Sequence, residues 1–182
     1  MKAIIIGIPG VGKTTVLKEA SKQLPKYETV NFGTKMLETA KKREIVEDRD
    51  QIRKLSPEKT KKLQKETAKK MKKKKKLLID THLAIETPKG IVPGIPKWVA
   101  EKIKPDRIIL IEAEPNEIRS RRKKDKTRKR SDFTLPPEQH QKLNRYYAAS
   151  ISTITGAVIK IIKNKPNKSK KAGKELVKTM KE

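Results

Sequence analysis

Short apolar runs alternate with amphipathic segments along the chain. The apolar runs predict five strands, and the segments between them carry apolar residues at helical spacing. The predicted strands are Ala3–Ile6, Glu28–Phe32, Leu77–Asp80, Arg107–Glu112 and Val158–Ile162. The predicted helices are Thr15–Lys22 with an end near Pro25, Gly33–Lys42, a helix from Ser56 to about Met71, Trp98 to just before Pro105, Asn116–Lys124, Glu138–Thr155 and Glu175–Lys181. Strands that alternate with helices indicate an α/β fold, in which helices cover both faces of a parallel sheet.

Two segments carry strong local signals. Ser56-Pro57-Glu58 predicts a helix start, because Ser caps a helix, Pro suits the first helical position and an acid suits the positive end. The helix that follows has one narrow apolar stripe, formed by Leu63, Thr67 and Met71. The segment Thr87–Pro96 holds three prolines and two glycines, which predict an ordered loop without a helix.

A glycine-rich motif separates the first predicted strand from the first predicted helix. Its residues are Gly7, Ile8, Pro9, Gly10, Val11, Gly12, Lys13, Thr14 and Thr15. Glycines let the backbone wrap around an anion, and the helix that starts there adds its positive end. Lys13 is expected to contact the outer phosphates of a nucleoside triphosphate, and the Thr14 hydroxyl to ligate Mg²⁺. The alternative is an ordinary glycine-rich turn, but the Lys-Thr pair and both flanking elements favour an ATP-type site.

An acid stands at the carboxyl end of the third predicted strand. Ligands of such folds bind beyond these strand ends, so Asp80 is expected to hold Mg²⁺ or its waters opposite the phosphate loop. The alternative is an Asp that caps the next element. His82, two residues further on, is interpreted as a packing or hydrogen-bonding residue.

Basic residues are concentrated between Arg119 and Arg130. Guanidinium groups bind phosphate oxygens in a bidentate manner, and mobile cations that close over a migrating phosphoryl group stabilise its charge. We therefore predict a short lid over about residues 119–137, with Arg122, Arg128 and Arg130 as catalytic cations. A basic surface helix is the alternative.

The sequence contains no obvious general base after the phosphate loop. An acceptor that is itself a phosphate arrives deprotonated and needs no base. This absence favours a nucleoside monophosphate kinase over a sugar kinase or a GTPase.

The net charge of the chain is unusual. Its 182 residues include 48 Lys and Arg against 21 Asp and Glu, which gives +27. Such a field attracts polyanions, so weak, nonspecific nucleic-acid binding at low salt is expected. Aromatic residues, on which single-strand binders stack bases, make up only 3%. The block Lys72–Lys76 is interpreted as the exposed end of a helix, and most of the lysines as a solvated surface.

Other features of the composition exclude several classes of site. The chain has no cysteine, which rules out disulfides and thiolate metal sites, and two histidines argue against a structural zinc site. No run of 18 apolar residues predicts a membrane span. A strand that follows Met1-Lys2 directly leads us to expect no secretory signal.

Several motifs together resemble the archaeal type of adenylate kinase, over essentially the whole chain. The phosphate loop alone is generic, whereas Glu47-Asp48-Arg49-Asp50, Asp80-Thr81-His82 and Pro93-Gly94-Ile95-Pro96 in combination are specific. The other matching segments are Val30–Thr34, Gln51–Leu55, Thr87–Gly90, Arg121-Arg122, Asp125 with Thr127–Arg130, and Gly156–Ile162.

The resemblance implies a P-loop NTPase fold with one domain over residues 1–182 and a five-stranded sheet ordered 2-3-1-4-5. It also implies conversion of ATP and AMP to two ADP, with Mg²⁺, in the cytoplasm, by a homotrimer. AMP is then expected between the Gly33–Arg53 segment and the Pro88–Pro96 loop, with Gly33, Thr34 and Arg53 in the monophosphate site, and the monophosphate-binding region over about residues 31–75. The chain departs from the pattern in its lysine content, which is expected to weaken the trimer at low salt.

Two alternatives remain open at this point. One is a P-loop ATPase associated with RNA or ribosomes, with the basic surface as its binding face. The other is a kinase for a different monophosphate, because no side chain identifies itself as a reader of adenine.

Overall fold

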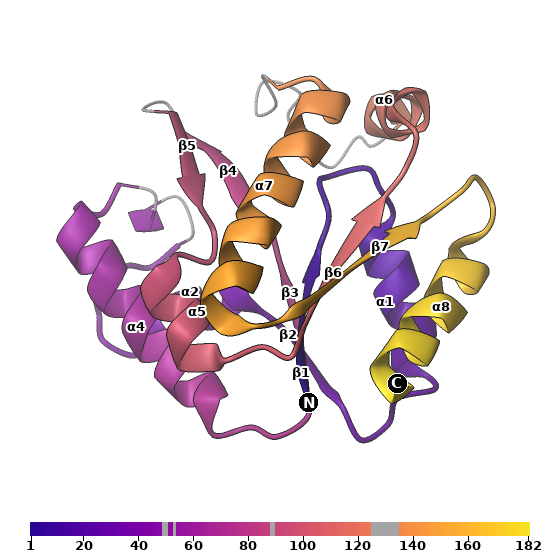
Figure 1. Cartoon of the computed structure of the whole chain (residues 1–182). Coiled ribbons are helices and arrows are strands. Elements are labelled where there is room, and N and C mark those ends of the chain that lie inside the picture. Colours follow the sequence, from indigo (N-terminus) through magenta and orange to yellow (C-terminus); the bar gives the residue numbers. More distant parts are fainter. Residues whose placement is uncertain (49–50, 53, 88–89, 125–134) are drawn as a thin grey trace.

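The structure is a computed structural model, and it describes residues 1–48, 51–52, 54–87, 90–124 and 135–182. Strands and helices alternate along most of the chain (Figure 1). The strands are β1 Lys2–Ile6, β2 Glu28–Asn31, β3 Leu77–Thr81, β4 Ala84–Thr87, β5 Gly90–Pro93, β6 Arg107–Glu112 and β7 Val158–Lys163. The helices are α1 Lys13–Ser21, α2 Phe32–Lys41, α4 Pro57–Lys72, α5 Lys97–Ile103, α6 Pro115–Lys124, α7 Pro137–Thr155 and α8 Ser169–Lys181.

Five of the strands form one parallel sheet in the order β2-β3-β1-β6-β7. When only the strands of this sheet are counted along the chain, the order is 2-3-1-4-5, so the predicted topology is confirmed. The register pairs Ile6 with Thr81 and Asn31 with Asp80. The carboxyl ends of β1, β2 and β3 therefore lie at one edge, where ligands of such sheets bind.

Helices cover both faces of the sheet, as expected (Figure 1). On one face, α2, α4, α5 and α7 bury a core with Ile4, Ile6 and Ile79 of the sheet. On the other face, α1 and α8 pack over Ile5, Leu78 and Ile109. Because successive residues of a strand point to opposite faces, the isoleucine run of β1 supplies both cores at once.

The prediction of a loop over Thr87–Pro96 is wrong in part. β4 and β5 form an antiparallel hairpin, in which Ile85 pairs with Val92. A two-stranded hairpin tolerates Pro93 at its end, since a strand with a neighbour on one side only leaves half of its N–H groups outside the ladder. The hairpin projects beyond the carboxyl edge of the sheet (Figure 1).

Close backbone contact fixes the base of this hairpin. The Gly94 N–H donates to the Leu83 carbonyl oxygen over 2.8 Å. A Cβ atom at Gly94 would lie 1.8 Å from the His82 carbonyl oxygen, so only glycine allows this approach.

The local helix signals hold, with one correction. The Ser56 hydroxyl accepts a hydrogen bond from the Lys59 N–H, and Leu63, Thr67 and Met71 are buried together with Ala68 on α4. The Lys72–Lys76 block is exposed at the end of that helix. The last helix begins at Ser169 and not at Glu175, because Ala172 and Gly173 already pack against α1 and the lysines around them face solvent.

None of the helices in the described part of the chain is long and apolar enough to cross a bilayer.

Candidate active site

The glycine-rich motif forms the loop between β1 and α1. Gly12 caps α1 in the left-handed region, with φ of 82°, which favours glycine. The loop closes on itself through a hydrogen bond from the Val11 N–H to the Ile8 carbonyl oxygen, 3.3 Å long. The sequence prediction of strand, loop and helix is therefore confirmed, and the positive end of α1 faces the loop.

The Lys13 side chain lies against the end of β3. Its Nζ is 2.6 Å from Oδ1 of Asp80 and donates to the Thr81 carbonyl oxygen over 2.6 Å. Lys13 is only 8% exposed. Asp80, which was expected opposite the phosphate loop, thus lies against the lysine of that loop, and the ion pair between them was not predicted.

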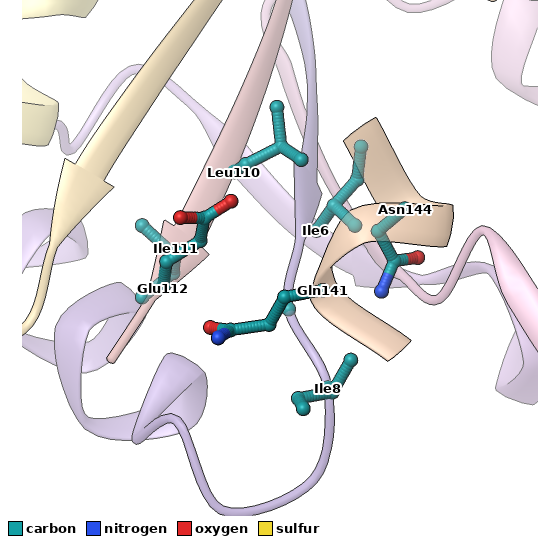
Figure 2. Close-up of a pocket in the computed structure, with 8 residues that line it drawn as sticks. Ile6, Ile8, Leu110, Ile111, Glu112, Gln141 and Asn144 are labelled. Atoms are coloured by element: carbon teal, nitrogen blue, oxygen red, sulfur yellow. The ribbon is translucent and has the colours of Figure 1, made fainter. Parts of the chain in front are cut away.

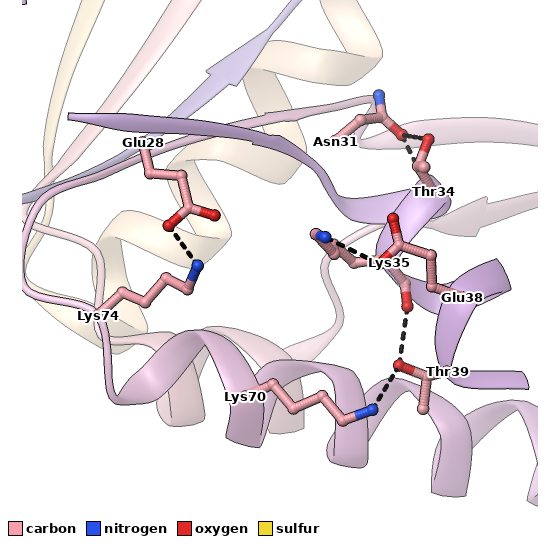
Figure 3. Close-up of polar contacts among 8 residues, drawn as sticks. All are labelled: Glu28, Asn31, Thr34, Lys35, Glu38, Thr39, Lys70 and Lys74. Atoms are coloured by element: carbon pink, nitrogen blue, oxygen red, sulfur yellow. Dashed lines mark hydrogen bonds and ion pairs between the residues drawn. The ribbon is translucent and has the colours of Figure 1, made fainter. Parts of the chain in front are cut away.

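A second pair of contacts extends this arrangement to α2. Oδ2 of Asp80 accepts a hydrogen bond from Nδ2 of Asn31 over 2.9 Å. Oδ1 of Asn31 in turn accepts from the Thr34 N–H at 3.0 Å and from its hydroxyl at 3.2 Å, as Figure 3 shows. Sequence reasoning assigned Thr34 and Gly33 to the site but missed Asn31, although an Asn before a helix is a strong capping signal.

Beyond Asn31, the first turns of α2 make several polar contacts with each other and with α4. The Lys35 ammonium pairs with Glu38, and the Thr39 hydroxyl donates to the Lys35 carbonyl oxygen (Figure 3). Nζ of Lys70 on α4 donates to the same Thr39 hydroxyl over 3.0 Å. The hydrogen bond between Lys70 and Thr39 thus joins α2 to α4.

Two arginines of α6 bind the outer side of the phosphate loop. Nε of Arg122 donates to the Pro9 carbonyl oxygen over 2.9 Å, and Nη1 of Arg121 donates to the Val11 carbonyl oxygen over 3.2 Å. These arginines bind carbonyl oxygens of the loop, so the N–H groups of the loop remain available to an anion that the loop encloses. Arg119 instead pairs with Glu138 over 2.8 Å, which ties α6 to α7 at the surface.

Three predicted site residues lie outside the described residues. They are Arg53, Arg128 and Arg130.

Asn164 supports the loop and was not predicted. Its Nδ2 donates to the Val11 carbonyl oxygen over 2.7 Å, and its Oδ1 accepts from the Ser169 hydroxyl over 3.2 Å. Asn164 is 1% exposed, so these hydrogen bonds satisfy a buried amide. No sequence signal near β7 pointed to this contact, because it joins positions 153 residues apart.

Polar side chains also support the site from behind. Gln141 of α7 bridges the N–H and the carbonyl of Ala113, each over 3.1 Å, next to the pocket in Figure 2. Oδ1 of Asn144 accepts hydrogen bonds from the N–H groups of Leu83 and Ala84 at the base of the hairpin. One face of α7 therefore holds both the end of β6 and the start of β4.

Glu112 at the end of β6 is buried and bound by two cations. Arg145 donates to both of its carboxylate oxygens, at 2.6 and 2.5 Å, and Lys163 lies 2.9 Å away. Burial alone would raise the pKa of Glu112, but the hydrogen bonds from Arg145 and Lys163 outweigh it and lower this pKa. Glu112 is thus an ionised structural anchor between β6, β7 and α7.

His140 is buried and His82 is partly buried, and both are neutral at neutral pH. Burial, reinforced by the charge of Lys13, lowers the pKa of His82 to about 3. Burial also lowers the pKa of His140, whose Nε2 lies 2.9 Å from the Ala84 carbonyl oxygen. The interpretation of His82 as a packing or hydrogen-bonding residue stays a prediction.

The donor set around the loop fits a hard cation that is shared with a ligand. The Thr14 side chain is exposed at the start of α1, and the Asp80 carboxylate is 22% exposed at the end of β3. Within the described ranges, no cluster of three or more His, Asp or Glu could hold a metal by itself. One carboxylate and one hydroxyl, completed by phosphate oxygens and water, is typical of Mg²⁺.

Comparison with known proteins agrees with this geometry. A protein-family model described as an AAA domain matches residues 6–141. The chain is 47% identical to the adenylate kinase of Methanocaldococcus jannaschii, over 98% of this chain and 97% of the relative. The chain belongs to the adenylate kinase family.

Other adenylate kinases are similarly related. Identity is 45% with that of Methanopyrus kandleri, over 97% of this chain and 96% of the relative, and 43% with that of Thermoplasma volcanium, over the full length of both. Among solved structures, shikimate kinase from Acinetobacter baumannii aligns with a TM-score of 0.59 at 13% identity, over 98% of this chain and 92% of that one. Shikimate kinase from Aquifex aeolicus aligns with a TM-score of 0.54 at 19% identity, over 100% and 96%. The structural neighbours support the fold alone.

A first prediction concerns Gly12. Gly12→Ala is expected to abolish nucleotide binding, because the new Cβ would lie 2.5 Å from Nδ2 of Asn164. Gly156 is a matched control, since its φ of 74° is similar but nothing lies within 4 Å of an added methyl group. Gly156→Ala should lose about 1–2 kcal/mol of stability to backbone strain alone and keep nucleotide binding. Calorimetric titration with ATP and thermal denaturation measure both; equal ATP affinity in the two variants would contradict the prediction.

A second prediction concerns pH. The unfolded chain protonates His82 and His140 near pH 6.5, whereas the folded chain keeps them neutral because their pKa values are lowered. The free energy of unfolding is therefore not reduced by these two groups above pH 6.5. Below that pH it falls as the pH falls, by up to about 1.4 kcal/mol per pH unit for each histidine, because only the unfolded chain takes up the protons. Urea denaturation between pH 7.5 and about pH 5 measures this slope, and His140→Gln should reduce it. A free energy of unfolding that stays constant over this range would contradict both pKa shifts.

Proposed function

We propose that this protein catalyses reversible phosphoryl transfer between ATP and AMP to give two ADP. The observation that carries the proposal is the contact chain from Lys13 through Asp80 and Asn31 to Thr34, in a chain whose full-length relatives are adenylate kinases. It joins a triphosphate-type loop to the N-terminus of a second helix, which is a natural place for a second phosphate. Two anionic nucleotides can then meet at the edge of one sheet.

The phosphate loop is proposed to hold ATP over residues 7–15. Loop N–H groups and the positive end of α1 bind its phosphates, and the Lys13 ammonium moves from Asp80 to the transferred group. That ammonium stabilises negative charge that develops in the transition state, which is the main task in phosphoryl transfer. The phosphate of AMP is already deprotonated, so no protein base is required.

Mg²⁺ is the proposed metal, bound through the Thr14 hydroxyl and, directly or through water, the Asp80 carboxylate. When bound, such an ion neutralises charge on the phosphates and orients them. Asp80 changes partner in this scheme, from the Lys13 ammonium to the ion, while Asn31 holds its other oxygen.

AMP is proposed to bind beside α2, with its phosphate near Gly33, Thr34 and Arg53, in a region over about residues 31–75. The hairpin β4–β5 lies at the same edge of the sheet and is the proposed opposite wall. A short lid over about residues 119–137 is proposed to close over both nucleotides. Arg122 at its base already contacts the phosphate loop, and Arg128 and Arg130 are the cations proposed to act during transfer.

The protein is also proposed to act as a cytoplasmic homotrimer. Edge strand β7 presents Val158, Ile159 and Ile161, which are 57, 36 and 38% exposed, and Ile154 of α7 is 43% exposed. An apolar strand at the edge of a sheet favours association, and a second copy of the chain is the proposed partner. Weak, nonspecific nucleic-acid binding at low salt stays a prediction from the charge of +27.

The test of the function is stoichiometric. Purified protein with Mg-ATP and AMP should form two ADP for each AMP consumed, reversibly, with little phosphate release when AMP is omitted. An RNA-associated ATPase would instead release phosphate and respond to RNA. Phosphate release without AMP-dependent ADP formation would remove the proposed function, and other nucleoside monophosphates in the same assay define the acceptor.

A third prediction concerns Lys13. Lys13→Ala should lower turnover by roughly 10²–10⁴, as expected for the loss of one electrostatic stabiliser of the transition state. Lys18→Ala is the matched control, because Lys18 lies exposed on the same helix. Its turnover should equal that of the wild type. Near-normal turnover of the Lys13 variant in the coupled assay would mean that this ammonium does not act on the transferred group.

A fourth prediction concerns the trimer. Sedimentation at moderate salt should give about three times the chain mass of 20.8 kDa, and lower salt should favour dissociation through charge repulsion. Ile161→Lys should dissociate the assembly, since it places a charge in the proposed contact. Ile91→Lys on the hairpin, where Ile91 is 37% exposed, is the control and should leave the mass unchanged. A wild-type protein that sediments as a monomer at all salt concentrations would refute the trimer.

A further inference from the structure

We propose that Asn31 is a positioning residue that keeps the two nucleotide sites in register. The inference rests on the proposed function and adds a role for a residue outside the set assigned above. Asn31 is the last residue of β2 and pairs in register with Asp80, the residue beside Thr81 at the end of β3. It contacts Asp80 on one side and the N-terminus of α2 on the other.

The direction of the Asn31 amide is set by its partners. The Thr34 N–H is a donor, so the atom that it contacts must be the amide oxygen of Asn31, at 3.0 Å. The NH₂ group then points to Asp80 and donates to Oδ2 over 2.9 Å. This hydrogen bond fixes one oxygen of the Asp80 carboxylate, so that the other oxygen, Oδ1, stays 2.6 Å from Nζ of Lys13.

Only an amide performs both tasks at once. Ser and Asp also cap helices, because their oxygens accept from the same backbone N–H groups. Ser is too short to reach from the cap to Asp80, and ionised Asp has no proton to donate. Helix capping alone therefore does not require Asn at this position, whereas orientation of Asp80 does.

The contact chain also explains how binding at one site is felt at the other. When Mg-ATP binds, Asp80 exchanges the Lys13 ammonium for the ion in the proposed scheme, so the charge that its carboxylate faces changes, and the strength of the hydrogen bond from the Asn31 NH₂ group changes with it. Polarisation along hydrogen-bonded groups then alters the bond from the Thr34 N–H to the same amide. The α2 N-terminus, where the AMP phosphate is proposed to bind, thus senses the state of the phosphate loop.

The test uses Asn31→Ser in the full-length protein. This variant keeps the helix cap, so its melting temperature should stay close to that of the wild type. Its kcat should fall by about 10- to 100-fold, the range for loss of a residue that orients a metal-binding or reacting group. The KM values for ATP and AMP should change by less than about threefold, because alignment and not binding is lost.

Three further variants separate positioning from packing. Asn31→Ala loses the cap as well, so it should show the same loss of kcat together with a lower melting temperature. Asn116→Ser carries the same substitution at an exposed Asn on α6 and should match the wild type. In an Asp80→Asn background, Asn31→Ser should cost less than about threefold, since residues that act through one another are not additive.

A readout without turnover completes the experiment. In the wild type, the Thr34 amide signal in ¹H–¹⁵N spectra should move when a non-hydrolysable Mg-ATP analogue binds in the absence of AMP. The movement should be lost in Asn31→Ser. A kcat within about twofold of the wild type, full additivity with Asp80→Asn, or an equal Thr34 response in both proteins would overturn the inference.

The two hypotheses fail in distinguishable ways. Failure of the proposed function appears in the wild type, as no AMP-dependent ADP formation. Failure of the inference appears only in the comparison between the wild type and Asn31→Ser, and the Thr34 signal answers it even if AMP is not the acceptor.

Discussion

The ion pair between Lys13 and Asp80 is the contact on which the rest of the site depends. It joins the first residue of α1 to the end of β3, and both of these are fixed by the central strands of the sheet. A buried ammonium without a counter-charge is costly, so the pairing of β1 with β3 and the form of the glycine loop are mutually dependent. Among the residues described, Arg121, Arg122 and Asn164 donate hydrogen bonds to carbonyl oxygens of the loop. Asp80 instead forms an ion pair with the Lys13 side chain of the same loop.

Helix α7 is the second element that organises this edge of the sheet. Gln141 holds the end of β6, and Asn144 and His140 hold the first residues of the hairpin. These side chains are buried and polar, so each must find a partner, and together they permit only one placement of the strands they contact. The neutral state of His140 belongs to the same network, because burial keeps its ring uncharged.

The sequence predicted those parts of the protein whose signals are local. Each of these signals is formed by residues that lie close together in the sequence. They are the isoleucine run of β1, the glycine loop, the Ser56 cap and the apolar stripe on α4, and the structure has all of them. Asp80 was also expected opposite the phosphate loop, because parallel topology brings the carboxyl ends of strands together, but its ion pair with Lys13 was not predicted. The hairpin and the start of α8 were missed, since prolines and lysines obscured short apolar patterns that become clear only against a packing partner.

Residues that act through long-range contacts could not be predicted. Asn164 meets Val11 across 153 positions, and Arg145 meets Glu112 across 33. An asparagine or an arginine side chain in a polar stretch can bind water or any of several neighbours. Only the tertiary structure determines which partner it has. Asn31 is an intermediate case. The local sequence predicts its role as a helix cap, but its contact with Asp80 depends on the register of β2 and β3.

The contact between Asn164 and the phosphate loop has a consequence for the order in which the protein matures. The loop is made in the first steps of synthesis, yet its outer side is completed by a residue far along the chain. Ser169 then holds Asn164, and Gly173 packs α8 directly against α1. A ribosome-bound chain that lacks these later elements has β1 and the glycine motif but an incomplete loop. The chain therefore acquires its nucleotide affinity late in synthesis, once β7 and α8 have been made and have packed against the rest of the fold.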